Sequence, residues 1–419
     1  MALSNITLSS AVRQNLLSLQ GTADLLATTQ GRLATGKKVN SALDNPTNFF
    51  TAAGLDARAS DISNLLDSIG NGVQVLQAAN TGITSLSKLV DTAKSIANQV
   101  LQQPSGFSVK ASDDFTGSAG AGSAAATTAD LTGATASALN GSVLTFTNKA
   151  GAAATITIGA TASALSGGVA TVKSLDDLNT ALAAAGVNLT ATLTGAAKLT
   201  FTSTNDGAGQ TITTGTAGAA PPTADAINIS ASAGSGAFSA SVGATPDAVS
   251  QTARSNLVSQ FNQIIGQITT TAQDSSFNGI NLLNGDTLKL VFDETGKSTS
   301  TIAGVTFNPA GLGLRTLTSG TDFIDNSTTN NILTSLNTAS VTLRSQASAF
   351  GANLSIVQIR QDFNKNLINV LQTGSSNLTL ADSNEEAANS QALSTRQSIA
   401  TSALSLANQS QQNVLQLLR

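Results

Sequence analysis

Adjacent carboxylates are the residues of this sequence that come nearest to a catalytic arrangement. They occur as Asp113–Asp114, Asp176–Asp177 and Glu385–Glu386. Carboxylate pairs can act in acid–base catalysis, but these pairs are sequence neighbours, which is typical of solvated faces and helix caps. The chain contains no His and no Cys, so it lacks the commonest general base, the thiolate nucleophile and the usual zinc ligands. We therefore expect no enzyme activity, metal or cofactor.

The overall composition argues against nucleic acid and membrane partners. The chain has 419 residues, 11% of them charged, and a net charge of only −4, so it offers no strong field to an anionic surface. The first twenty residues lack the basic and apolar regions of a secretory signal, and no run of 18 apolar residues occurs. We expect any export to need no cleaved signal. A Cys-free chain is compatible with a secreted bacterial protein that assembly stabilises.

The first of the predicted structural elements is a helix at residues 384–419. Its apolar residues recur in steps of four and three, with Gln397 and Gln411 in two of the positions, which is a heptad seam. The apolar members are Leu393, Ala400, Leu404, Ala407, Val414 and Leu418. We expect this seam to need a partner, either the other end of the chain or another copy.

A second seam of the same kind lies in a helix expected at residues 4–35. Its members are Val12, Leu16, Leu19, Ala23, Leu26, Gln30 and Leu33. Gly21 and Gly31 each weaken this helix by about 1 kcal/mol relative to Ala, so it should be poorly ordered alone. An ordinary core helix is the alternative interpretation.

Two long helices are predicted at residues 57–102 and 329–372, each about 65–70 Å in length. The first carries a seam with a register shift between Ile83 and Leu86, and Asn80 occupies one of its positions. The second is the most regular seam in the chain, from Leu336 to Leu371. Residues 36–56 are expected to form a connector, because Asp44-Asn45-Pro46 is a turn signal.

The middle of the chain, residues 105–246, is predicted to be a strand-rich domain. Ala, Thr, Gly and Ser dominate it, and alternating apolar residues separated by Gly turns are typical of strands. Six strands are expected near residues 143–147, 155–158, 189–194, 198–202, 211–214 and 227–230. A helix with Ser174 as N-cap and Asp177 at its third position interrupts them. A hairpin is expected where residues 288–292 and 302–307 flank a turn at 294–297.

These elements predict an α+β fold. Helices of matching length are nested around the strand-rich domain, so the two long helices can run antiparallel as a coiled-coil rod with that domain at its far end. The expected domains are terminal helices at 1–40 and 384–419, a helical rod with the hairpin at 41–104 and 247–383, and the strand-rich outer domain at 105–246.

Three motifs resemble those of bacterial flagellins. Gln30–Pro46 (QGRLATGKKVNSALDNP) is similar to the family's helix–turn block, Ser276–Leu283 (SFNGINLL) to its FNG-containing turn, and Ser405–Arg419 (SLANQSQQNVLQLLR) to its C-terminal tail. The resemblance covers residues 1–104 and 247–419. Lys173–Ser203 is more weakly similar to a strand-rich motif of flagellin and hook-protein outer domains.

The resemblance implies a structural subunit that polymerises into the extracellular flagellar filament for swimming motility. It also implies type III export, with an export apparatus, a chaperone, a filament cap and hook-associated proteins as partners. The terminal helices would line the filament core. Polar seam residues such as Gln30, Asn80, Gln397 and Gln411 would then permit small slides between helices. A hook–filament junction protein and an adhesin or glycan-binding module are the alternatives. The interface residues implied are Val12, Leu16, Leu19, Leu26, Leu33, Leu393, Leu404, Ala407, Val414 and Leu418.

Overall fold

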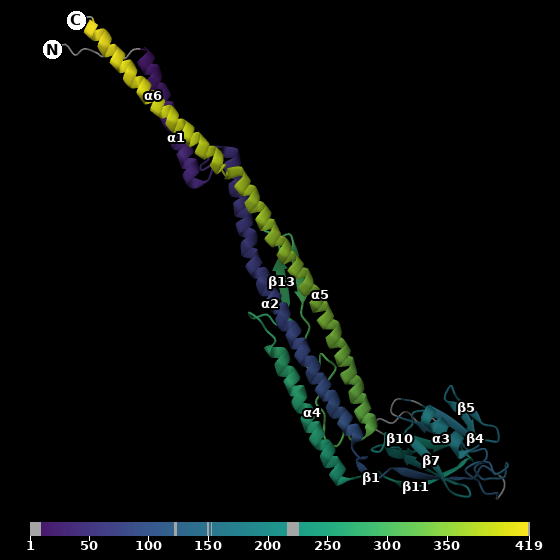
Figure 1. The fold of residues 1–419 in the computed structure, drawn as a ribbon. Coiled ribbons are helices and arrows are strands. Elements are labelled where there is room, and N and C mark those ends of the chain that lie inside the picture. The colour runs from purple at the N-terminus through teal and green to yellow at the C-terminus, as the bar shows by residue number, and fades with distance from the viewer. Residues whose placement is uncertain (1–9, 121–123, 149–150, 152, 216–225, 418–419) are drawn as a thin grey trace. The chain divides into compact units, whose positions relative to one another are not determined.

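The computed structural model describes residues 10–120, 124–148, 151, 153–215 and 226–417. The chain forms two compact units. Unit 1 comprises Met1–Gln74, Leu288–Ile302 and Asn353–Arg419, and unit 2 comprises Val75–Thr287 and Ala303–Ala352. Long helices from the two ends of the sequence flank a strand-rich middle (Figure 1). This order of elements confirms the predicted α+β class.

Six helices occur in the described part of the chain. They are α1 (Ser10–Thr35), α2 (Pro46–Gln102), α3 (Leu175–Ala184), α4 (Ala248–Asp274), α5 (Asn326–Thr379) and α6 (Ser383–Leu417). The first residues of the predicted N-terminal helix, 4–9, lie outside the described residues.

Helix α2 begins at Pro46 and not near residue 57, so much of the predicted connector is helical. Asn45 is the reason. Its Oδ1 accepts a hydrogen bond from the Asn48 backbone N–H at 3.0 Å, as an N-cap side chain does. Pro46 then occupies the first helical position, where its missing N–H costs nothing. The Asn-Pro pair that we read as a turn is a helix start.

The seam of α2 is buried largely as predicted, with one correction. Ile62, Ile69, Leu76 and Leu86 are all buried, but Asn80 is exposed, and Ala79 takes the buried position in its place. The buried residues therefore step from 73 to 76 to 79, and the register shift lies about two turns earlier than we predicted. Local overwinding accommodates two successive steps of three. Asn80 cannot act as a polar seam residue.

The predicted seam of α5 is confirmed by burial. Each of its members is buried or half-buried, from Leu336 through Phe350 and Val357 to Leu371. In unit 1, Leu371, Leu367 and Ile368 of α5 pack against Ala59 and Ile62 of α2. The polar member Asn364 is also buried, and its Nδ2 donates to the Phe292 backbone oxygen at 2.9 Å. This bond ties α5 to the neighbouring hairpin.

The hairpin pairs β13 (Thr287–Val291) with β14 (Thr299–Ala303). The second strand therefore begins three residues earlier than we predicted. The turn closes directly after the first strand, where the Phe292 N–H donates to the Ser298 oxygen at 2.8 Å. The residues that we expected to continue the strand instead bond elsewhere, with Val305 N–H donating to the Leu282 oxygen at 2.7 Å.

Two antiparallel-rich sheets form the strand-rich domain inside unit 2. All six predicted strands are present. Others whose small or acidic residues mask the alternation were missed, among them β2 (Ser112–Gly117) and β11 (Gly236–Val242). The six-stranded sheet has the order β5 (Ser163–Ser166), β6 (Val169–Val172), β4 (Ala153–Ile158), β3 (Val143–Thr147), β10 (Ala226–Ala231) and β9 (Thr211–Thr214). The four-stranded sheet has the order β11 (Gly236–Val242), β2 (Ser112–Gly117), β8 (Lys198–Ser203) and β7 (Leu189–Gly195). Strands β1 (Phe107–Val109) and β12 (Thr245–Pro246) pair where the chain enters and leaves the domain.

Aromatic and aliphatic residues of both sheets share one core. Phe146 of β3 contacts Phe201 of β8 with ring centroids 5.4 Å apart, and Ile156 and Ile229 are fully buried in the same core. Helix α3 closes this core with Leu178 and Leu182. Its predicted capping box is confirmed, because Ser174 and Asp177 bond reciprocally at its first turn.

Asp113 of β2 is an unusual buried residue of this domain. Its side chain is 1% exposed, and neither carboxylate oxygen has a hydrogen-bond partner among the described atoms. Burial raises the pKa of Asp113 above its ordinary value. Its neighbour Asp114 is the opposite case. Hydrogen bonds from Lys198 and Thr200 lower the pKa of Asp114, and its Oδ2 lies 2.7 Å from Lys198 Nζ.

We expect Asp113→Asn to stabilise unit 2 at pH 7 by about 1–2 kcal/mol, because ionised Asp113 is desolvated in the fold. Because the pKa of Asp113 is higher in the folded than in the unfolded state, its protonation favours folding. This contribution to stability is fully present below the unfolded-state pKa and is lost as the pH rises through the folded-state pKa. The gain should therefore vanish near pH 3. Asp114→Asn is the matched control and should destabilise at pH 7 only. Urea unfolding followed by circular dichroism at both pH values measures these differences, and a pH-independent Asp113→Asn effect would contradict the prediction.

Candidate functional site: the terminal helix pair

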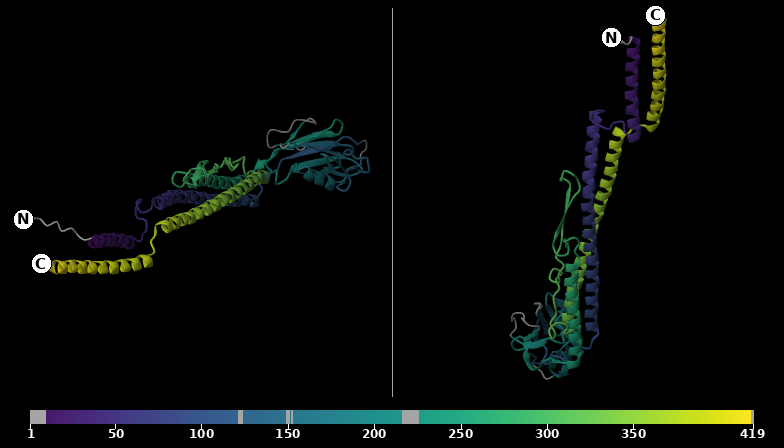
Figure 2. Two further views of the ribbon diagram at one scale, coloured as in Figure 1. Left: turned by 90° about the horizontal axis from the view of Figure 1, so that it is seen from above. Right: turned by 90° about the vertical axis from the view of Figure 1, so that its left-hand side faces the viewer.

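Helices α1 and α6 lie side by side in unit 1 and run antiparallel, as both views of this pair show (Figures 1 and 2). Both helices are rich in Ser, Thr, Asn and Gln and carry few charges. Arg13, Asp24 and Arg32 are the charged residues of α1, and Glu385, Glu386 and Arg396 are those of α6. Few charges therefore have to be desolvated when this surface meets a similar one.

Backbone hydrogen bonds hold the inner ends of the two helices together. Helix α1 ends at Thr35, and the following Gly36 has a φ of +67°, which suits the left-handed residue that closes a helix. The Ala381 N–H donates to the Gly36 oxygen at 3.0 Å, and the Lys38 N–H donates to the Thr379 oxygen at 2.7 Å. The end of α1 is thus fastened to the junction between α5 and α6.

One ion pair joins the helices at this end. Arg32 Nη1 lies 3.3 Å from Glu386 Oε1, and the Glu386 side chain is 10% exposed. Arg32 is in the last turn of α1, while Glu386 is in the first turn of α6. Each charge therefore also faces the favourable end of its own helix dipole.

The inward face of α6 follows the predicted seam. The least exposed residues after Glu386 are Ser390, Leu393, Gln397, Ala400, Leu404 and Ala407, in steps of four and three. Leu393, Leu404 and Ala407 are half-buried on this inward face of α6. Val414 belongs to α6, but nothing is described of its side chain, and Leu418 lies outside the described residues.

The inward face of α1 follows the predicted seam only in part, and Ala23 is half-buried as that seam requires. Val12, Leu19 and Leu26 do face inward. However, Leu16 and Leu33 are exposed, and the intervening positions belong to Asn15, Thr22 and Thr29. Thr22 is buried without needing a partner on α6, because its hydroxyl donates to the Ser18 backbone oxygen at 2.8 Å. Gln30 is exposed and not a seam residue.

A second apolar face on each helix points away from the pair. On α1, Leu17 is 70% exposed and Leu25 is 56% exposed, and on α6 Ile399 and Leu406 are 65% and 69% exposed. Ile399 and Leu406 line a shallow groove of about 440 Å³ together with Thr395, Ser398, Ser402 and Ala403. No described part of the chain covers these side chains. Sequence periodicity indicates a wide apolar face but not which residues it leaves uncovered.

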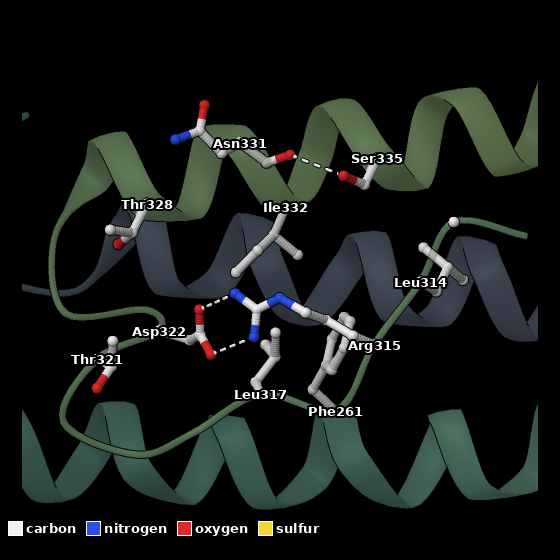
Figure 3. Close-up of a pocket in the computed structure, with 11 residues that line it drawn as sticks. Phe261, Leu314, Arg315, Leu317, Thr321, Asp322, Thr328, Asn331, Ile332 and Ser335 are labelled. Carbon is white, nitrogen blue, oxygen red and sulfur yellow. Dashed lines mark hydrogen bonds and ion pairs between the residues drawn. The ribbon is translucent and has the colours of Figure 1, made fainter. Parts of the chain in front are cut away.

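A larger cavity lies in unit 2 between α4, α5 and the segment that joins β14 to α5 (Figure 3). It has a volume of about 590 Å³, and Phe261, Leu314 and Ile332 contribute apolar lining. Arg315 and Asp322 form a two-point ion pair across it, with Nη1 2.7 Å from Oδ2. Burial opposes the charge on Asp322, yet Arg315 holds the pKa of that carboxyl below its ordinary value. The charges satisfy each other, so this cavity offers no free base.

One member of each adjacent carboxylate pair has a structural role. Asp177 caps α3, Asp114 pairs with Lys198, and Glu386 pairs with Arg32. Within the described residues, no three acidic side chains are placed to hold a metal ion. The described helices also include none with a long enough apolar stretch to cross a membrane.

Comparison with known proteins identifies both ends of the chain. Residues 4–112 match the bacterial flagellin N-terminal helical region, and residues 322–418 match the bacterial flagellin C-terminal helical region. The two matched regions contain α1 and α2 on one side and α5 and α6 on the other.

Individual relatives agree with this assignment. The chain is 32% identical to "Flagellin FljM" of Caulobacter vibrioides and 31% identical to "Flagellin FljK" of the same organism, each over 164 residues. Each of these two matches covers 39% of this chain and 59% of the relative. This chain is also 39% identical to "Flagellin A" of Rhizobium meliloti over 77 residues, which are 18% of this chain and 20% of that relative. The chain thus spans less than two thirds of the relatives it matches. The chain belongs to the bacterial flagellin family, a family of structural proteins.

Proposed function

We propose that this protein is a subunit that polymerises into the bacterial flagellar filament and so serves swimming motility. The observation that carries this proposal is the outward apolar face of the terminal pair. Leu17, Leu25, Ile399 and Leu406 expose large apolar side chains on two long helices that carry few charges. Exposed apolar surface on this scale is typical of a protein interface.

Polymerisation supplies what the isolated pair lacks. Helices with this composition are marginal without tertiary packing. Neighbouring copies that cover the outward faces would stabilise the helices by mass action, so ordering and assembly are coupled. Contacts between different faces of successive copies do not close into a ring and generate a helical filament.

The interface residues divide between two roles in this proposal. Val12, Leu19, Leu26, Leu393, Leu404 and Ala407 would hold α1 against α6 within a subunit. Leu16 and Leu33 are exposed in the chain alone, so their contacts would be to other copies. Val414 and Leu418 complete the set of residues that we propose for the filament core.

The partners and location follow from the same proposal. We infer extracellular localisation in the filament, type III export without a cleaved signal, and contacts with the export apparatus, a chaperone, the filament cap and hook-associated proteins.

Seeded assembly tests the proposal. Purified protein is heated, cooled and mixed with short seeds, and negative-stain electron microscopy should then show long filaments. Folded protein that caps seeds without extending them would contradict the filament-subunit proposal and favour a junction protein of the same family.

Limited proteolysis gives a second expected result. In the monomer, a protease should remove roughly residues 1–40 and 385–419 first, because helices of this composition are marginal until neighbouring copies cover their outward faces. In the sedimented polymer the same segments should resist cleavage at the same protease concentration. The strand-rich domain is the internal control, since its core residues should be equally resistant in both states. Equal cleavage of the ends in monomer and polymer would oppose burial of the terminal helices on assembly.

A further inference from the structure

Helix α5 carries an apolar stripe that is separate from its buried seam and from the terminal pair. In unit 1, Ile356, Ile359, Phe363 and Val370 are between 52% and 67% exposed. Their spacing of three, four and seven residues places them along one side of the helix, apart from the seam residues Val357, Asn364 and Leu371. We call these four residues the α5 ridge. It extends about 21 Å along the helix.

Helix α2 carries an exposed stripe of a different kind in the same unit. Phe50, Ala53, Ala57, Ser60 and Asn64 recur in steps of three and four, and all five are exposed. Ala53, Ala57 and Ser60 are small, so their side chains project little from the helix along this stripe. We call this stripe the α2 groove. A bulky ridge packs closely into such a groove when two helices meet.

The charges beside the ridge and the groove are complementary. Asp56 and Asp61 are exposed on the two sides of the α2 groove, and residues 46–74 carry three Asp and one Arg. That single Arg, Arg58, already pairs with Glu294 at 2.6 Å. Beside the α5 ridge, residues 353–379 carry Arg360 and Lys365 against one Asp, and this Asp362 lies 3.5 Å from Lys365, so Arg360 supplies the net positive charge. The groove is therefore net acidic and the ridge net basic, which favours their association over ridge with ridge or groove with groove.

From this complementarity we infer that the α5 ridge of one copy docks into the α2 groove of a second copy of the same chain. The inference rests on the proposed function, because the polymer supplies the second copy. The two surfaces are different, so the contact is heterologous and repeats from copy to copy without closing. It is a second subunit contact, distinct from that of the terminal helices.

The absence of Cys from the chain allows a direct test. Filaments of the double variant Ile359→Cys/Ala57→Cys are treated with a short bismaleimide and analysed on a denaturing gel. A heterologous contact should give a ladder of dimers, trimers and higher species. Each single variant should remain monomeric, and so should Ile359→Cys/Ser63→Cys, because Ser63 lies away from the groove on the same helix.

The other possible results of the cross-linking experiment contradict either the docking of ridge and groove or the proposed function. Intact filaments of the double variant without a ladder would overturn the docking of ridge and groove but leave the filament proposal standing. Dimers from Ile359→Cys alone would also overturn it, since they show two ridges in contact. Failure of the unmodified protein to form filaments would instead remove the proposed function on which the inference depends.

A second measurement covers the case in which the cysteine variants assemble poorly. Phe363→Ser should raise the critical concentration for polymerisation by roughly tenfold or more, because a large apolar contact is lost. Val249→Ser is the matched control, since Val249 is an exposed apolar residue of α4 outside the ridge. The monomers of both variants should have the same free energy of unfolding as the parent monomer. A Phe363→Ser protein that polymerises at the parent's critical concentration would overturn the inference.

Discussion

The double substitution Leu17→Asp/Ile399→Asp should abolish polymerisation at concentrations where the parent protein forms filaments. Both side chains project outward from the terminal pair and are largely exposed in the single chain. In the proposed filament they would be buried against apolar neighbours. An uncompensated charge in such a contact costs about 3–5 kcal/mol, and each 1.4 kcal/mol changes an equilibrium constant tenfold. We therefore expect the critical concentration to rise by at least about a hundredfold.

Sedimentation of the polymer measures this effect, and monomer unfolding supplies the control. Exposed positions tolerate substitution within about 0.5 kcal/mol, so the monomer of the double variant should unfold at the parent's urea concentration. Val249→Asp introduces the same charge at an exposed apolar position of α4 and should polymerise normally. Polymerisation of the double variant at the parent's critical concentration would show that the outward faces of α1 and α6 do not meet other subunits.

Arg254→Met should strongly destabilise unit 2. Arg254 is 2% exposed in α4, and its guanidinium donates to two backbone oxygens. Nη1 lies 2.8 Å from the Phe323 oxygen, and Nη2 lies 3.0 Å from the Pro104 oxygen. Burial lowers the pKa of Arg254, while the nearby Asp325 carboxylate opposes that shift. The guanidinium thus connects α4 with the chain that leaves α2 and the chain that enters α5.

The expected loss of unfolding free energy for Arg254→Met is about 3–5 kcal/mol. The substitution removes the donors to the buried Phe323 carbonyl and to the Pro104 carbonyl, whose bond is part-buried, and it removes the cation that faces Asp325. Asp325 also caps α5, because its Oδ1 accepts from the Thr328 N–H at 2.9 Å. The start of α5 should therefore be affected as well.

Urea unfolding followed by circular dichroism measures this loss, and Arg344→Met is the matched control. Arg344 is exposed on α5, and its side chain donates to Ser340 one turn earlier in the same helix. Its replacement should change stability by less than about 0.5 kcal/mol. A loss below about 1 kcal/mol for Arg254→Met would mean that the two carbonyls find other donors.

The long helices were predictable because their signal is local and repeated. A seam such as that from Leu336 to Leu371 contains many independent matches to one period, and all its members are buried or half-buried. The start of α2 was not predicted correctly. Asn45-Pro46 suits both a turn and a helix start, and only the cap made with Asn48 distinguishes them.

Strands with mixed composition were the least predictable elements. Strand β2 contains Asp113 and Asp114, and two adjacent carboxylates argue against a buried strand. Its partners β8 and β11 nevertheless bury one side of it. Nothing in the local sequence indicates that Asp113 is buried while Asp114 meets Lys198, because Lys198 lies 84 positions away in the chain.

The amino-acid sequence by itself determined the α+β fold class, the approximate positions of the helices and the resemblance of both ends to flagellins. Those features depend on periodic apolar residues and on short motifs, which are visible without a fold. Only the tertiary structure decided which sides of the helices are covered. Val12 and Leu19 face inward from α1 while Leu17 and Leu25 do not, and Arg254 gains its role from Phe323 and Pro104. Burial depends on partners that are distant in sequence. The apolar period therefore predicts a helix, but it does not predict which side of that helix stays exposed for contact with other subunits.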